Sequence, residues 1–263
     1  MSLRARGAVL FILVSVVSFA AACGGGGGLF GRQYEYEEDL FLALDGSARL
    51  TVNASMAALV ALRGLDVPLD PDAAIDRDRV RALFSSPATN VTHVSRGWRR
   101  AGRRFVQVRL EVPDIRRLTE AAPFAWSTYD LVEADGEHVF RQRIGASAFQ
   151  PGTLQQVGWT GREIVAFRVH LPSRIRYHNA RDIDTLETHD TERGNILRWE
   201  QYMADRLDGV PIDVEVRMDS QSILYQTLWL FATAFLAAVS LLGFLVWLMF
   251  RRGARQTAIP PSP

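Results

Sequence analysis

The feature that most constrains this chain is an uncharged apolar run near its C-terminus, Leu228–Phe250. Its 23 residues would form a helix of ~35 Å, enough to cross a hydrocarbon core of ~30 Å with some tilt. The run contains seven Leu, four Phe and two Val, which at ~−0.5 kcal/mol each favour insertion by ~6 kcal/mol. Trp229 and Trp247 lie near its ends, where indole rings prefer the headgroup boundary. The run is therefore predicted to be a transmembrane helix.

The charges beside the two apolar ends predict the topology. Arg251, Arg252 and Arg255 follow the C-terminal run, so the positive-inside rule places the tail 251–263 in the cytoplasm. At the other end, a basic start precedes the apolar run Ala8–Ala22, which spans only ~22 Å. A run of this length after positive charges is typical of a secretory signal peptide, here residues 1–22. The predicted protein is single-pass in the cytoplasmic (inner) membrane, with residues 33–221 on the periplasmic or extracellular side.

Cys23 is the candidate for lipidation. Ala20-Ala21-Ala22-Cys23 resembles the lipobox of bacterial lipoproteins, whose cysteine is acylated and becomes the mature N-terminus. The same alanines also fit an ordinary A-x-A cleavage site, which would leave Cys23 unmodified. Both alternatives stay open. The glycine-rich stretch 23–32 would serve as a flexible tether in either case.

Composition excludes several kinds of site. A single cysteine excludes an internal disulfide framework and a multi-cysteine metal centre. All 30 basic residues are arginine, so a phosphate-loop lysine, a Schiff-base lysine and a Ser-Lys dyad are absent. Without the arginines of the two ends, 25 remain against 29 acidic residues. The exported part is therefore mildly acidic, and its export argues against a nucleic-acid partner.

Residues 33–221 have the length of one domain or two small ones. Alternating apolar residues predict a hairpin of two strands, from Tyr34 to Val52, with a tight turn at Asp45-Gly46. A helix capped by Asn53 is expected to follow and to end at Gly64, and a second helix is expected from Asp70 to Phe84. Asp114 is expected to cap a short helix. Residues 96–104 and 172–195 are expected to be loops.

Further strands are predicted by the same alternation of apolar and polar residues. They cover residues 106–112, 126–133, 137–144, 163–171 and 212–218. Hairpins dominate, with helices between some of them. The predicted fold is α+β, with a mainly antiparallel sheet and two or three helices, plus the transmembrane helix.

The order of these parts resembles a known family. The chain resembles the LppM-like envelope lipoproteins of actinobacteria and other bacteria in three parts. These are a lipobox-like signal, an exported domain that opens with a strand, an Asp-Gly turn, a strand and a helix, and a C-terminal span with a basic end. The stretches that carry the resemblance are Tyr34–Gly64, Arg103–Val112, Ala121–Tyr129 and Val214–Ser222, together with the span. The resemblance implies a membrane-tethered domain that contacts a lipid or glycolipid, and none of its motifs has a catalytic meaning.

No catalytic, metal or cofactor site is predicted. Gly145–Phe149 begins like a nucleophile elbow but has Phe149 where glycine is needed, so Ser147 is interpreted as a loop residue. The histidines form no H-E-x-x-H motif. The acidic stretch 182–192 could hold a hard cation, but the pattern of a calcium loop breaks at Leu186, which favours a solvated loop.

One basic cluster is the candidate binding site. It consists of Arg96, Arg99, Arg100, Arg103 and Arg104. Arginine binds phosphate bidentately, and Trp98 lies among these residues, so the cluster could meet anionic headgroups. Alternatively, these arginines pair with the acidic remainder of the domain, and this second interpretation is favoured.

Three functions are compatible with these sequence features. The preferred one is a non-enzymatic, membrane-anchored envelope protein whose exported domain binds a lipid, a glycolipid or a protein partner. The second is an envelope hydrolase or transferase with an unrecognised site, in which His178 or His189 would approach Asp182 or Asp184. The third is a structural subunit of a membrane complex that recruits partners through its span.

Overall fold

The computed structural model describes residues 32–70, 72–148, 157–193 and 195–256. The chain divides into two units, Met1–Tyr34 and Glu35–Pro263. Nearly all of the described residues belong to the second unit. The predicted signal peptide, Cys23 and nearly all of the predicted tether lie outside the described residues, as does the tail beyond residue 256.

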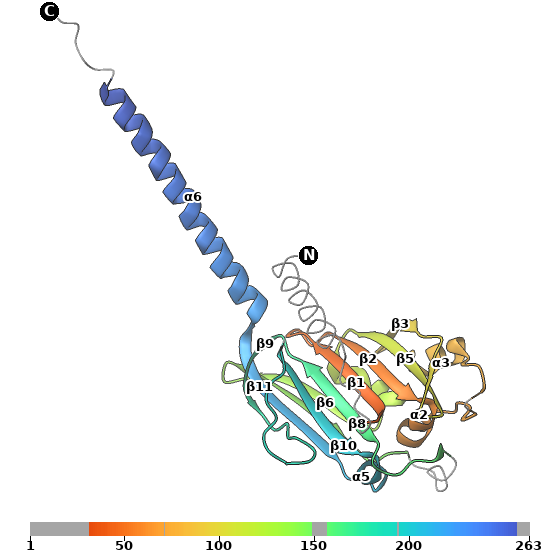
Figure 1. Ribbon diagram of the computed structural model, residues 1–263. Coiled ribbons are helices and arrows are strands. Elements are labelled where there is room, and N and C mark those ends of the chain that lie inside the picture. The colour runs from red at the N-terminus through yellow and green to blue at the C-terminus, as the bar shows by residue number, and fades with distance from the viewer. Residues whose placement is uncertain (1–31, 71, 149–156, 194, 257–263) are drawn as a thin grey trace, which may run out of the picture. The chain divides into compact units, whose positions relative to one another are not determined.

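Runs of consecutive strands are separated by short helices along the described part of the chain, as expected of an α+β fold (Figure 1). The strands are β1 (Tyr34–Leu42), β2 (Ala48–Ser55), β3 (Asn90–Val94), β4 (Trp98–Arg100), β5 (Arg103–Val112), β6 (Ser127–Ala134), β7 (Glu137–Ile144), β8 (Ile164–His170), β9 (Ser173–His178), β10 (Ile196–Tyr202) and β11 (Ile212–Ser222). The helices are α2 (Met56–Arg63), α3 (Arg77–Phe84), α5 (Met203–Leu207), α6 (Ile223–Gln256) and the 3-10 helices η1 (Ile115–Glu120) and η2 (Ala122–Phe124).

The strands form two sheets. The larger sheet has the order β10-β8-β1-β2-β5-β3, with β4 also paired to β5, and the smaller sheet has the order β6-β7-β11-β9. Neighbouring strands are antiparallel in β10–β8, β1–β2, β2–β5, β6–β7 and β11–β7. Between β1 and β8, Arg168 contacts Glu37 while His170 contacts Asp39, so these two strands run in the same direction. The prediction of an α+β fold with a mainly antiparallel sheet is confirmed.

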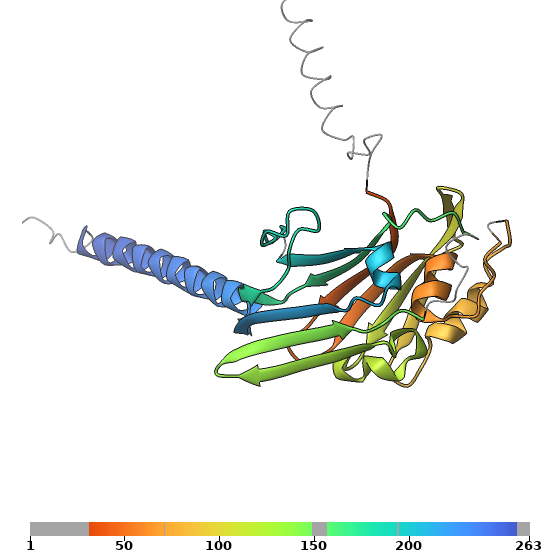
Figure 2. The same cartoon turned by 90° about the horizontal axis from the view of Figure 1, so that it is seen from below.

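The main core lies between the inner faces of the two sheets. Alternation along β1 and β2 buries Leu40, Leu42, Leu50 and Val52, and the register places Leu40 opposite Leu50. From the smaller sheet, Phe140, Val214, Val216 and Met218 join the same cluster. Helices α2 and α5 lie at the end of the sheets opposite to the start of α6 (Figures 1 and 2). The period of two read from the sequence therefore locates most of the core.

Helix α2 begins and ends at identifiable caps. The side chain of Ser55 accepts a hydrogen bond from the N–H of Ala58, and Gly64 ends the helix with φ +66°. The predicted cap, Asn53, is instead the third residue from the end of β2, where its side chain accepts a hydrogen bond from Gln107. The strand pairing with β5 extends to Ser55, so the strand holds Asn53 and the helix starts two residues later.

The second predicted helix is shorter than expected. The sequence predicts a start at Asp70, whereas α3 begins after Asp76, whose side chain accepts hydrogen bonds from the N–H groups of Asp78 and Arg79. Asp76 is thus the true N-cap, and the chain from Asp72 to Ile75 is not helical. The cap expected at Asp114 is confirmed, since its carboxylate accepts from the N–H of Arg116 at the start of η1.

Two predicted loops contain strands. Residues 96–104 include β4, which pairs with β5 through a turn at Ala101-Gly102, where both residues have positive φ. Residues 172–195 include β9, the edge strand of the smaller sheet. β9 lacks a clean alternation because its pairing with β11 is interrupted by register shifts, so its residues carry no clear strand pattern. Strands β3 and β10 were not predicted either.

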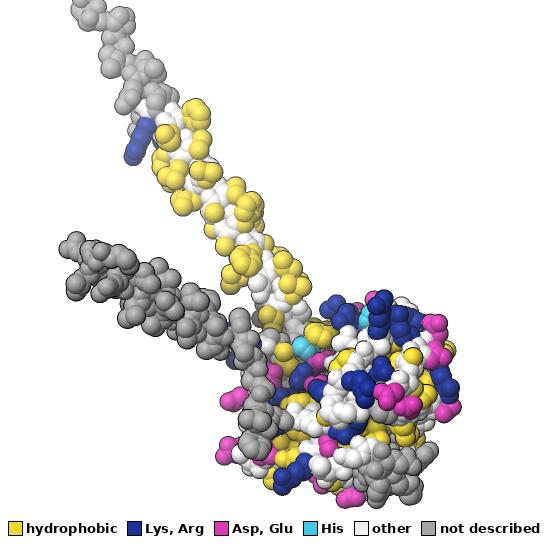
Figure 3. All heavy atoms as spheres, turned by 45° about the vertical axis from the view of Figure 1, so that its right-hand side comes forward, with side chains coloured by type: hydrophobic (Ala, Val, Ile, Leu, Met, Phe, Trp, Pro, Cys, Tyr) yellow, Lys and Arg dark blue, Asp and Glu magenta, His cyan; other side chains and the backbone are white. Residues whose placement is uncertain are grey.

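The C-terminal apolar run forms α6, which is long and apolar enough to cross a membrane over Ile223–Arg252. Apolar side chains are exposed along this helix, and basic side chains lie toward its far end (Figure 3). Near its start Tyr225 and Trp229 stack edge to face, and near its end Arg251 lies over the ring of Trp247 at 5.1 Å. The helix begins five residues before the predicted span because β11 passes into it directly.

Gly97, in the connection between β3 and β4, provides a test of local packing. It has φ +83°, and an added Cβ would lie 2.4 Å from Cδ1 of Ile75 and 2.9 Å from the carbonyl oxygen of Phe105. Gly97→Ala is expected to lower the free energy of unfolding by about 2–4 kcal/mol, because backbone strain and overpacking add. Gly102→Ala is the matched control, with φ +75° but no described atom within 4 Å, and should cost about 1–2 kcal/mol. If thermal denaturation showed the same loss of unfolding free energy for Gly97→Ala and Gly102→Ala, this assignment would be contradicted.

Candidate functional site

The predicted arginine cluster does not form one surface. In the β4–β5 hairpin, Arg99 lies opposite Arg104 and Arg100 lies opposite Arg103. Because successive strand residues point to opposite faces, these two pairs project to different sides of the sheet. Arg96 precedes the hairpin and is exposed. The five arginines were grouped because they are close in sequence. The turn at residues 101–102, which separates them onto two strands, was not predicted.

Several of these arginines already have partners. Arg99 contacts Asp72 with an N–O distance of 2.6 Å, and the guanidinium of Arg100 lies 4.4 Å from the ring centroid of Phe105. Arg103 donates to Glu35 at 2.9 Å and to the carbonyl of Val157 at 3.0 Å, and its side chain is only 12% exposed. These contacts agree with the interpretation that the arginines pair within the domain. Contact of the cluster with anionic headgroups stays a prediction.

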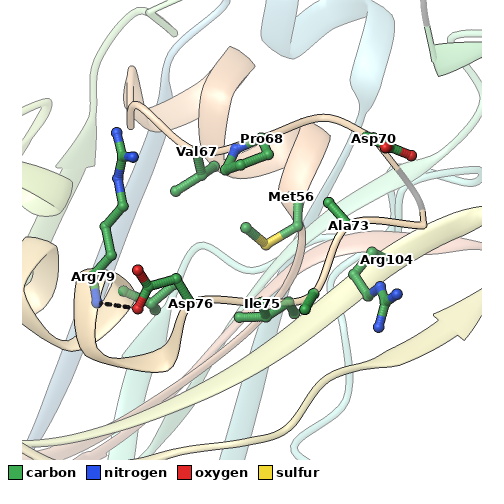
Figure 4. A pocket seen from close by; sticks show the side chains of 11 residues that line it. Met56, Val67, Pro68, Asp70, Ala73, Ile75, Asp76, Arg79 and Arg104 are labelled. Carbon is green, nitrogen blue, oxygen red and sulfur yellow. Dashed lines mark hydrogen bonds between the residues drawn. The ribbon is translucent and has the colours of Figure 1, made fainter.

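Arg104 borders a small pocket between the start of α2 and the chain before α3 (Figure 4). Its apolar wall consists of Met56, Val67, Pro68, Ile75 and Val80, and Asp70 and Arg79 lie at its border. The volume is about 10 Å³, the space of one water molecule. The pocket is therefore too small for an organic ligand.

A larger groove lies at the edge of the sheets where α6 begins. We call this the α6 edge, and it comprises the β1–β2 turn (Ala43–Ser47), Pro113 and the β8–β9 turn (Leu171-Pro172). The groove has a volume of about 640 Å³, within the range of sites for small molecules. Eight of its twelve lining residues are apolar: Phe41, Leu42, Ala43, Ala48, Val112, Pro113, Leu171 and Pro172.

An aromatic cluster forms one wall of this groove. Phe41 is 40% exposed and stacks on His170 with the ring centroids 3.7 Å apart. The guanidinium of Arg49 lies 5.6 Å from the ring centroid of Phe41. Behind the histidine, Oδ1 of Asp39 lies 3.6 Å from Nε2 of His170. Arg49 and Glu111 stand directly opposite each other on β2 and β5, so the rim carries both signs of charge.

An apolar floor with a charged rim suits an amphiphile. The apolar part of the ligand would replace water on Phe41 and Pro172, and a polar head could meet Arg49 or His170. The groove was not predicted from the sequence, since its residues come from three separate segments. Phe41 was the available signal: it is a large apolar residue on the face of β1 that otherwise carries Glu35, Glu37 and Asp39.

A second polar group lies inside the core. Glu38 accepts hydrogen bonds from the hydroxyl of Tyr36 and from the guanidinium of Arg63, the latter at 2.5 Å, and both members of this ion pair are at most 4% exposed. Nε of Arg63 also donates to the Tyr36 hydroxyl at 3.0 Å. Glu38 shares the even-numbered face of β1 with Leu40, which is why it points inward.

Burial is the main influence on the pKa values of the side chains around this buried ion pair. It raises the pKa of Tyr36 well above its ordinary value, and the nearby Glu38 raises it further. Burial alone would lower the pKa of Arg63, but its electrostatic interactions with Tyr36 and Glu38 outweigh that effect and raise it. Burial, assisted by Arg63, lowers the pKa of Arg206 to about 10. Tyr36 therefore stays neutral and Arg63 and Arg206 stay charged at neutral pH, so the cluster is a structural ion pair with an additional cation.

Tyr129, Ser127 and Gln142 continue this polar core on the smaller sheet. Tyr129 lies opposite Gln142 in the β6–β7 pairing, and burial raises the pKa of Tyr129. Arg206 donates to the carbonyls of Gly145 and Val210 and thereby ties α5 to the end of β7. None of these roles was predicted from the sequence, because Gly145 is distant along the chain from Arg206, and Gln142 meets Tyr129 only through the strand pairing.

The histidines and the acidic loop 182–192 make local contacts. Nε2 of His189 lies 3.2 Å from the guanidinium of Arg198, and burial lowers the pKa of His178. Asp184 accepts a hydrogen bond from the hydroxyl of Tyr202 at 2.6 Å, and Asp182 accepts from the N–H of Thr185. Among the described residues, no group of three His, Cys, Asp or Glu side chains is placed to hold a metal ion.

Comparison with known proteins finds a distant structural likeness. No family model matches the chain, and no curated protein matches it. Among solved structures, it is similar to the NMR structure of the folded domain of the LppM protein from Mycobacterium tuberculosis. The two are 12% identical, the match covers 74% of this chain and 95% of that one, and the TM-score is 0.37. The similarity says nothing about a ligand or a partner of this chain.

Proposed function

We propose that this protein is a single-pass, membrane-anchored binding protein of the bacterial cell envelope. In this proposal α6 spans the cytoplasmic membrane, the sheet domain lies on its outer side, and the C-terminus is cytoplasmic. The domain binds a lipid or glycolipid in the groove at the α6 edge and performs no reaction of its own. Cys23, when acylated, would add a second anchor.

The position and lining of the groove carry this proposal. Its volume of about 640 Å³ suits an organic ligand, and its wall includes Leu171 and Pro172, whose turn contacts the first residue of α6. An amphiphile that leaves the bilayer beside α6 would meet this groove first. The arginines in the last turns of α6, beyond the apolar run, support the orientation, because positive flanks stay on the cytoplasmic side.

A matched pair of substitutions tests the groove. Phe41→Ser removes the most exposed apolar wall and should weaken lipid binding about 10- to 100-fold, the effect of losing ~1.5–3 kcal/mol of apolar contact. Val132→Ser, on β6, is the control, because Val132 is 39% exposed and Phe41 is 40% exposed. Native mass spectrometry of full-length protein purified from membranes in mild detergent would count the bound lipids.

The outcomes of this experiment are distinct. Lipid adducts on the wild type and on Val132→Ser, with few on Phe41→Ser, would support the proposal. A wild type that carries no lipid adduct, or adducts that persist on Phe41→Ser, would exclude the groove as the lipid site.

A further inference from the structure

The passage from the sheet into α6 has no linker. β11 ends at Ser222 and α6 begins at Ile223. The hydroxyl oxygen of Ser222 accepts hydrogen bonds from the N–H groups of Leu224 at 3.1 Å and Tyr225 at 3.4 Å, which caps the helix. The strand therefore becomes a helix within one peptide unit, and no loop is present there to act as a hinge.

The β8–β9 turn holds this junction from the side. The N–H of Ile223 donates to the carbonyl of Pro172 at 3.1 Å. Ser173 is fully buried, and its hydroxyl donates to the carbonyl of Gln221 at 2.7 Å. The first residue of α6 and the last part of β11 are thus both bonded to residues 172–173.

Asn195 fastens the same turn to β10. Its side-chain amide donates to the carbonyl of Leu171 at 3.0 Å and also to that of Ser173, and its own carbonyl accepts from the N–H of Leu171 at 3.0 Å. It has φ +63°, a conformation that asparagine tolerates better than most residues. We call Leu171–Ser173 and Asn195 the junction clamp.

The clamp fixes the position of the α6 edge relative to the start of α6. Leu171 and Pro172 belong both to the clamp and to that edge, so the edge lies beside the first turn of α6. Tyr225 and Trp229 near the start of α6 are residues that prefer the headgroup boundary. The exposed Phe41 and Arg49, which line the groove at this edge, offer a headgroup layer an apolar ring and a cation, and Asp45 and Glu111 add negative charge beside them.

We propose that the α6 edge is a bilayer-docking surface and that the junction clamp holds the domain on the membrane in one orientation. The docking partner is the headgroup layer of the same membrane that α6 crosses. The turn at residues 101–102 lies at the other end of β5, about 30 Å along the strand from Val112, since β5 advances ~3.3 Å per residue. The arginines of the β4–β5 hairpin therefore face away from this membrane. This inference rests on the span assigned to α6 under the proposed function, but not on lipid binding in the groove.

The test compares two turns of the full-length protein in vesicles of phosphatidylglycerol and phosphatidylcholine. In a Cys23→Ala background, a fluorophore is attached at Asp45→Cys, in the β1–β2 turn, or at Ala101→Cys, in the β4–β5 turn. A nitroxide on the lipid headgroup then quenches fluorophores near the bilayer surface. We expect loss of fluorescence at position 45 and none at position 101.

Two changes test whether the clamp causes this difference. A six-residue Gly-Ser insertion between Ser222 and Ile223 should release the domain and abolish the difference between the two positions. The same insertion after Gln256 is the control and should leave it unchanged. Asn195→Gly tolerates the positive φ but removes the side-chain amide, so it should reduce quenching at position 45 without preventing folding.

The failures of the two proposals are distinguishable. Alkaline extraction of the wild type from the vesicles would refute the span itself and the docking with it. Protein that stays inserted but shows equal quenching at positions 45 and 101 would refute only the docking. A difference that survives the insertion at residue 222 would refute the role of the clamp.

Discussion

Glu38→Leu is expected to destabilise the sheet domain by about 3–5 kcal/mol, because it leaves the buried guanidinium of Arg63 without its carboxylate. For a domain of this size, the change corresponds to a loss of about 10 °C or more in the Tm. Circular dichroism of the full-length protein in detergent would measure it. The hydroxyl of Tyr36 also loses its acceptor, which adds to the effect.

Two further variants separate the cost of an unpaired charge from the value of the pair. The double variant Glu38→Leu with Arg63→Met removes both charges and should regain most of the lost stability, because an apolar replacement of a buried pair is often neutral. Asp213→Leu is the surface control. Asp213 pairs with Arg143 at 3.0 Å, but both side chains are more than half exposed, so less than about 1 kcal/mol is expected. A Glu38→Leu protein as stable as the wild type, or a double variant no better than the single one, would contradict the role assigned to the buried pair.

The second large effect concerns α6. In a Cys23→Ala background, which removes any lipid anchor, Leu236→Arg together with Leu241→Arg is expected to release the protein from the membrane. Each change from Leu to Arg near the helix centre costs ~3–4 kcal/mol of insertion free energy, so two exceed the ~6 kcal/mol that favours insertion. Extraction of membranes at alkaline pH would move the double variant to the supernatant and leave the wild type in the pellet.

Conservative changes at the same positions control for disturbed folding. Leu236→Val with Leu241→Val keeps the helix apolar and should stay in the pellet. If the double arginine variant also resisted extraction, α6 would not be the membrane anchor. Partial extraction of the single Leu236→Arg variant is expected, because the remaining insertion free energy is then only ~2–3 kcal/mol.

Patterns over a few neighbouring residues correctly predicted several strands, a turn and a helix end. The alternation in β1, β2, β5, β7 and β11 identifies strands with one buried face, and the structure confirms each of them. Gly46 and Gly64 were correctly expected at a turn and at a helix end, where positive φ favours glycine. The cap of the second helix was wrong: the carboxylate of Asp70 accepts from the N–H of Asp72 in a turn, whereas Asp76 accepts from the N–H groups at the start of α3.

The candidate sites were predictable only in part. The five arginines could be named, but their division between two faces depends on the turn at Ala101-Gly102. Glu35 was expected on a solvated face and is instead fully buried beneath Arg103, a residue 68 positions away. The groove is lined by three segments that become neighbours only in the folded sheet. No continuous stretch of sequence therefore predicts it.

By itself, the sequence determined the apolar helix at the C-terminus, the strand periodicity and the cap at Asp114. Each of these depends on transfer free energy or on hydrogen bonds within a few residues, which neighbours along the chain decide. Only the tertiary structure decided that Glu38 and Arg63 form a buried pair, that β8 runs parallel to β1, and that the β8–β9 turn is bonded to the start of α6. Those features depend on which segments contact each other in the folded chain. The free energy of these contacts comes from residues that are far apart in the sequence.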